Sequence, residues 1–109
     1  MSKPGFYNGK HYTEYVDKVE ALKRADNLDK AEKLLLELVD AVEEEARAEG
    51  YGVAPWYYEQ LAIVYRKQKN YKGERTILER YAGQRHALGA TGPKLIKRLE
   101  KIVRLSQSE

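Results

Sequence analysis

Apolar residues recur every three or four positions through almost all of this 109-residue chain, from His11 to Leu105. A period near 3.6 residues is typical of helices with one buried face, and the strict alternation of a half-buried strand is absent. The sequence therefore predicts an all-α fold without strands. The predicted helices cover residues 11–25, 28–49, 55–69, 71–84 and 93–105.

Local signals mark several helix ends. Gly50 and Gly52 follow the second helix, and glycine adopts the left-handed conformation of a helix C-cap at little cost. Pro55 and Pro93 suit the first turn of a helix, where the missing N–H has no intrahelical acceptor to lose. The stretch 83–92 contains three glycines and fits either a helix or a loop.

The chain length favours one domain with one core. Residues 1–10 are expected to form a flexible N-terminal arm, 11–105 a single helical domain and 106–109 a fraying tail. The apolar stripes of the helices predict the buried core. Its expected members are Leu35, Leu38, Leu61, Ala62, Tyr65, Leu78 and Leu99.

The third predicted helix is apolar on every side. Tyr58, Leu61 and Tyr65 share one face of the helical wheel, while Trp56 and Ile63 share another. A helix of this kind is buried on several sides, as expected for the central helix in a stack of five.

The chain also matches itself when it is shifted by 43 residues. Tyr15 then falls on Tyr58 and Asn27 falls on Asn70. A self-match of this length predicts a repeated helix-turn-helix unit.

These paired helices resemble the tetratricopeptide repeat superfamily over roughly residues 12 to 86, with 93–105 in the place of a terminal capping helix. The repeat spacing of 43 departs from the usual 34, and Glu74 stands where the family has a small residue. The closer matches are Tyr58, Leu61, Ala62, Tyr65, Asn70, Tyr71 and Leu78. The looser ones are Tyr15, Val19, Leu22, Asn27, Leu28, Ala31 and Leu35.

The resemblance implies a non-catalytic adaptor that binds a protein or peptide along the inner side of its leading helices. The family's clamp for a terminal carboxylate needs asparagine and lysine where this chain has Asp17 and Gln60, so that specificity is not expected. The residues that the resemblance places on the inner side are Thr13, Asp17, Glu20, Lys23, Trp56, Gln60, Ile63 and Lys67.

The last helix offers an alternative site. One of its faces carries the cations Lys94, Lys97, Arg98, Lys101 and Arg104. Such a face can follow a nucleic-acid backbone or receive an acidic partner, although few aromatic residues are interleaved for base stacking. Residues 1–54 carry a net charge of −4 and residues 55–109 one of +7, which leaves head-to-tail association of two copies open.

Motifs for catalysis and cofactors are not found. The chain has no Cys, two His on separate segments, and Ser at positions 2, 106 and 108 alone. The carboxylates of Glu43–Glu45 and Glu49 have the chemistry to hold a hard metal ion, but consecutive helical residues point apart, so a solvated helix face is expected instead. We therefore expect no enzymatic activity, metal or cofactor. Without an apolar leader or a span of about 20 apolar residues, the sequence predicts a cytoplasmic protein that does not contact membranes.

Overall fold

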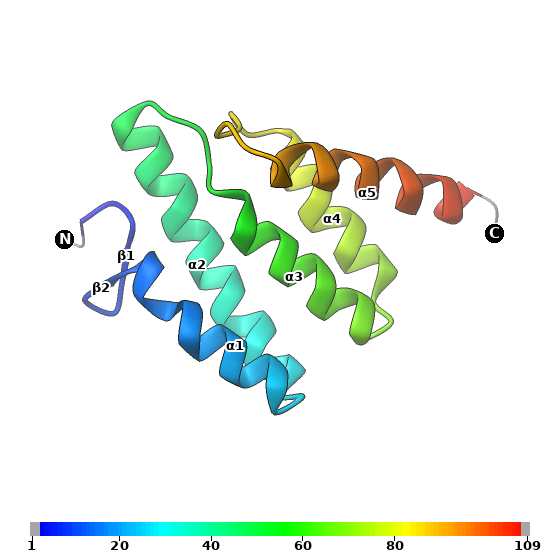
Figure 1. The fold of residues 1–109 in the computed structure, drawn as a ribbon, viewed down its shortest axis with the longest axis horizontal. Helices are drawn as coiled ribbons and strands as arrows, with labels where there is room; N and C mark the ends of the chain where they lie inside the picture. Colours follow the sequence, from blue (N-terminus) through cyan, green and yellow to red (C-terminus); the bar gives the residue numbers. More distant parts are fainter. Residues whose placement is uncertain (1–2, 108–109) are drawn as a thin grey trace.

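A computed structural model describes residues 3–107, and the expected all-α class is confirmed (Figure 1). Short turns join α1 to α2 and α3 to α4, longer loops over residues 50–54 and 83–90 make the other connections, and a two-stranded hairpin precedes the helices. In chain order the elements are β1 Phe6–Tyr7, β2 Lys10–His11, the 3-10 helix η1 Tyr12–Tyr15, α1 Val16–Arg24, α2 Leu28–Glu49, α3 Pro55–Lys67, α4 Tyr71–Ala82 and α5 Thr91–Gln107.

The helix bounds agree with prediction where the ends have a local cause. α2 ends before Gly50, which has φ 75° and donates its N–H to the Ala46 carbonyl at 2.8 Å. The first predicted helix is divided into η1 and α1, and α3 and α4 each stop two residues early. α5 begins at Thr91, so Pro93 is its third residue, and it continues into the predicted tail; residues 108–109 of that tail lie outside the described residues.

The turns within the two helical hairpins have the same backbone geometry. Asp26 and Lys69, which lie 43 residues apart, have φ values of 56° and 58°. The N–H groups of Asn27 and Asn70 each donate to the carbonyl five residues earlier, at 2.9 and 2.8 Å. The sequence self-match therefore corresponds to two turns of equal shape.

Neighbouring helices along the chain pack against each other. α1 and α2 form one antiparallel hairpin, α3 and α4 form the second, and α2 packs on α3 (Figure 1). α5 packs on both α4 and α3, at the opposite end of the molecule from the β hairpin. α3 thus has helices on several sides, which explains why apolar residues surround it.

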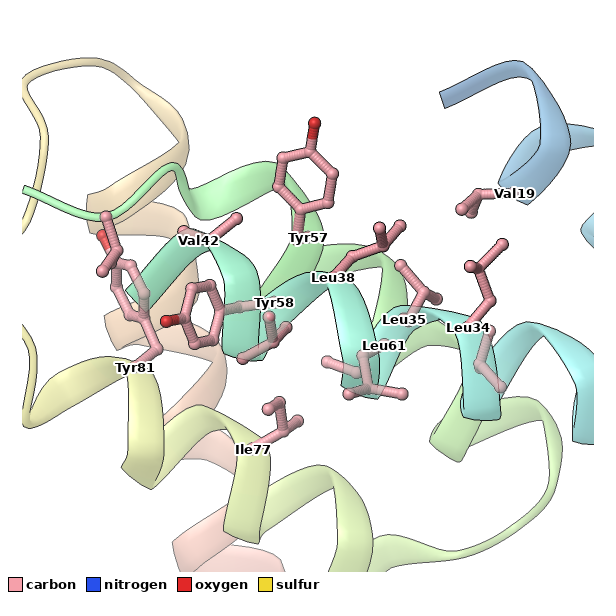
Figure 2. Close-up of a cluster of buried hydrophobic side chains, with 14 of the residues drawn as sticks. Val19, Leu34, Leu35, Leu38, Val42, Tyr57, Tyr58, Leu61, Ile77 and Tyr81 are labelled. Atoms are coloured by element: carbon pink, nitrogen blue, oxygen red, sulfur yellow. The ribbon is translucent and has the colours of Figure 1, made fainter. Parts of the chain in front are cut away.

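The core lies between the four helices of the hairpins and extends to α5 through the buried Leu95 and Ile102. Figure 2 shows side chains from all four in one cluster, among them Val19 of α1, Leu38 of α2, Leu61 of α3 and Ile77 of α4. Of the residues predicted to be buried, Leu99 is the exception, because it lies on the flank of α5 and remains half-buried. The confirmed members are Leu35, Leu38, Leu61, Ala62, Tyr65 and Leu78.

The expected absence of strands is wrong at the N-terminus. Phe6 pairs with His11 and Tyr7 with Lys10, around a turn in which Asn8 and Gly9 have φ values of 50° and 82°. The dipeptide Asn-Gly favours the tight turn of such hairpins. Residues 6–10 therefore form part of a hairpin and not a loose arm.

The hairpin packs on the C-terminal half of α2, which has 22 residues where α4 has 12. Glu45 receives hydrogen bonds there from the Tyr12 hydroxyl at 3.2 Å and from Tyr51, and its carboxylate lies 2.5 Å from Nε2 of His11. The additional turns of α2 therefore provide the surface on which the N-terminal segment folds.

Glu43 and Glu45 are not on a solvated face, contrary to the sequence interpretation. Glu45 is half-buried under the N-terminal segment, and Glu43 is only 7% exposed. Its carboxylate accepts hydrogen bonds from the Tyr58 hydroxyl and from Nε of Arg80, both at 2.8 Å. The hydrogen bond with Glu43 also raises the pKa of Arg80. Packing of the second hairpin over α2 thus turns a predicted surface carboxylate into a link between α2, α3 and α4.

Candidate functional site

One strip of α3 remains open although the rest of that helix is buried. Its members are Trp56, Glu59, Ile63, Arg66 and Lys67, of which Lys67 is exposed and the others are half-buried. They recur at intervals of three or four residues and so lie on one side of the helix. We call this strip, together with the flanking sides of α1 and α5, the inner face.

The α1 flank of the inner face is closed more tightly than the sequence predicted. Gln60 is only 6% exposed and accepts a hydrogen bond from Lys23 of α1. Gln60 therefore belongs to the junction between α1 and α3 and not to an open surface. Of the other residues predicted on this side, Glu20 of α1 is half-buried, while Asp17 of α1 and Thr13 of η1 are exposed.

Trp56 lies at the start of the open strip. Its ring meets that of Tyr57 edge to face, with centroids 4.9 Å apart, and it packs partly against the core. Its position is fixed on the core side while part of the indole faces solvent. The structure thus places Trp56 at the border of the core, with one side packed and the other open to solvent.

The α5 flank forms a cleft of about 420 Å³ against α3. α3 contributes Glu59 and Arg66 to this α3–α5 cleft. Arg104, the fifth cation predicted for the basic face, is exposed and lies outside the lining. The lining residues from α5 are Lys94, Leu95, Lys97, Arg98 and Lys101.

A buried carboxylate beneath the cleft holds two of its cations. Glu74 of α4 is 0% exposed. Its carboxylate accepts hydrogen bonds from Nε and Nη2 of Arg66, at 2.7 and 3.0 Å, and from Nε of Arg98 at 2.8 Å. The hydrogen bond to Glu74 raises the pKa of Arg66. The small residue expected at this position is thus replaced by a carboxylate that ties α3 and α5 to α4.

The three lysines of the cleft differ from its two arginines, which form ion pairs with Glu74. Lys94, Lys97 and Lys101 are exposed, and no carboxylate within residues 3–107 forms an ion pair with them. Their charges therefore remain available at the edge of the cleft.

The neighbours of the basic helix that were not predicted from the sequence are Glu59, Arg66 and Glu74. The unexpected Glu74 in a small-residue position was a usable signal, because a buried carboxylate needs cationic partners. The cationic partners of Glu74 were not predictable from sequence spacing, since Arg98 is 24 residues away from Glu74.

His86, in the loop between α4 and α5, is anchored despite its exposure. Its ring stacks on Tyr81 with centroids 4.2 Å apart, and its Nε2 lies 2.8 Å from the Tyr81 carbonyl oxygen. These contacts fix the loop over residues 83–90, whose conformation the sequence left open.

No family model, curated protein or solved structure matches this chain. Among residues 3–107, no group of three or more His, Asp or Glu side chains is arranged to hold a metal ion. None of the helices in this range combines the length and the apolarity that a membrane span requires.

Proposed function

We propose that this chain is a non-catalytic module that binds a protein or peptide partner on its inner face. The observation that supports this function best is the open strip of α3. Trp56 and Ile63 stay partly exposed there, on a helix whose other sides are buried. Aromatic and aliphatic anchors surrounded by polar groups are typical of the energetic centre of a protein interface.

The arrangement of the helices favours a tetratricopeptide-like adaptor as the class of module. Two helical hairpins with turns of equal shape follow each other, and a further helix packs on the second. In this arrangement α1, α3 and α5 supply the inner face, which contacts the partner.

Selection from a random peptide library displayed on phage tests the proposal without a known partner. We expect peptides that bind the wild type, and we expect the double variant Ile63→Ser, Lys67→Ala to bind them at least about tenfold more weakly, equivalent to 1.4 kcal/mol. Both side chains point away from the buried stripe, so the melting temperature should change little.

The matched control is Leu36→Ser with Lys72→Ala. These residues also pair a half-buried aliphatic with an exposed lysine, but they line a different cleft, between α2 and α4. Equal loss of binding in both double variants, or no selectable peptide, would contradict the proposed function.

A further inference from the structure

We infer that the partner segment is acidic and that its side-chain carboxylates dock in the α3–α5 cleft. This inference rests on the proposed function and adds the chemistry of the ligand and its position. The lining carries five cations against one carboxylate, that of Glu59. A concave surface with such an excess of one charge attracts and orients the opposite charge.

The buried Glu74 arranges part of this cleft before a ligand arrives. Arg98 contacts Glu74 through Nε, and within residues 3–107 no hydrogen bond of its Nη groups is found. A guanidinium held at one edge presents its remaining N–H groups in a fixed direction, which suits a carboxylate. Because one carboxylate faces both Arg66 and Arg98, the trio keeps a net positive charge.

The spacing of the free lysines matches an extended peptide. Lys94 and Lys101 are seven residues apart on α5, and a helical rise of 1.5 Å per residue separates them by about 10 Å. An extended strand covers that distance in about three residues, at roughly 3.3 Å each. Alternate positions of a strand point to the same side about 6.6 Å apart, so acidic residues at three successive alternate positions span about 13 Å and cover the distance between the two lysines.

The composition of the lining favours a peptide over a nucleic acid. No aromatic ring lines the cleft on which a base would stack, and Glu59 would repel a continuous phosphate backbone. In an acidic peptide, by contrast, backbone N–H groups alternate with the carboxylates and can donate to Glu59.

Fluorescence anisotropy with a labelled peptide tests the inference. The probe is a peptide of about eight residues with glutamate at alternate positions, capped at both ends so that side-chain carboxylates alone carry charge. The comparison peptide has glutamine in place of each glutamate. We expect the glutamate peptide to bind at least about tenfold more tightly than the glutamine peptide.

Charge reversal locates the site. Lys97→Glu with Lys101→Glu should weaken binding of the glutamate peptide at least about tenfold. The matched control, Lys30→Glu with Lys33→Glu, makes the same change in net charge at exposed positions of α2, and should change affinity less than about twofold. Equal effects of the two double variants, equal affinity for the two peptides, or no binding of the glutamate peptide would overturn the inference.

Two further outcomes distinguish an acidic peptide from a nucleic acid and from a non-acidic peptide as the ligand. Tighter binding of a single-stranded oligonucleotide than of the glutamate peptide, lost on reversal of Lys97 and Lys101, would overturn the choice of a peptide. If library selection yields peptides that need Ile63 and Lys67 but are not acidic, the inference fails while the proposed function stands.

Discussion

Replacing Glu74 by alanine tests the link between α3, α4 and α5. The carboxylate is fully buried and accepts two hydrogen bonds from Arg66 and one from Arg98. A hydrogen bond to a charged group contributes about 1.5–3 kcal/mol to stability. The side chains of Arg66 and Arg98 are 40% and 27% exposed, so both guanidiniums regain water when the carboxylate is removed. The loss should therefore be smaller than the sum of the three bonds.

We expect Glu74→Ala to lower the free energy of unfolding by about 3 kcal/mol, the lower end of the range for breaking a buried ion pair. For a chain of this size, that change corresponds to a fall of roughly 13 °C in Tm. Urea unfolding followed by far-UV circular dichroism measures it, provided that the slope m stays constant. In a double-mutant cycle, Arg98→Ala should couple to Glu74→Ala by about 1–2 kcal/mol.

Glu79→Ala is the matched control, since it makes the same substitution on the same helix. Glu79 is exposed and pairs with Arg75 one helical turn away, so its loss should cost less than about 0.5 kcal/mol. Unfolding of Glu74→Ala and Glu79→Ala at the same urea concentration would refute a stabilising role of the Glu74 ion pairs.

Two other changes address polar groups outside the cleft. The Tyr81 hydroxyl is buried without a hydrogen-bond partner in the described part of the chain, so Tyr81→Phe should raise stability by about 1 kcal/mol, and a lower Tm would contradict this. Burial acts to raise the pKa of Glu45, but hydrogen bonds from Tyr51 and His11 outweigh it and lower the pKa below its usual 4.5. The stability that the ionised Glu45 contributes is present above that value and is lost as pH falls through the folded-state pKa. Glu45→Gln should therefore lower Tm at about pH 7 and much less at about pH 3. The same Tm difference from the wild type at both pH values would contradict this.

Elements whose ends are marked by adjacent residues were predictable from the sequence. α2 runs between Asn27 and Gly50, as expected, because glycine after the helix takes the left-handed conformation. The N-terminal hairpin was missed because its strands have two residues each, too few to show alternation. The Asn8-Gly9 dipeptide was the usable signal for it.

Burial of polar residues was harder to predict than burial of apolar ones. Glu43 and Gln60 lie beside the apolar stripes of their helices, where a small rotation decides between core and solvent. Glu43 meets Arg80, which is 37 residues away, so their contact depends on how the hairpins pack.

In the candidate site too, some features follow from local sequence and others depend on tertiary packing. The basic face of α5 was predictable from helical spacing alone, because Lys94, Lys97 and Lys101 lie on one side of the helix. Its position against Arg66 was not, since that contact requires α5 to cross from α4 to α3. Local sequence thus predicts which residues share a face, and tertiary packing decides which faces form a cleft.

The most direct test of inner-face binding is an NMR titration of isotopically labelled protein with a library-selected peptide, following backbone amide shifts. Binding on the inner face predicts that the largest changes occur at Ile63, Lys67 and Lys97, on α3 and α5, while Leu36 and Thr76 on α2 and α4 change little. If the largest changes occur at Leu36 and Thr76 while Ile63 and Lys97 are unaffected, binding on the inner face is contradicted.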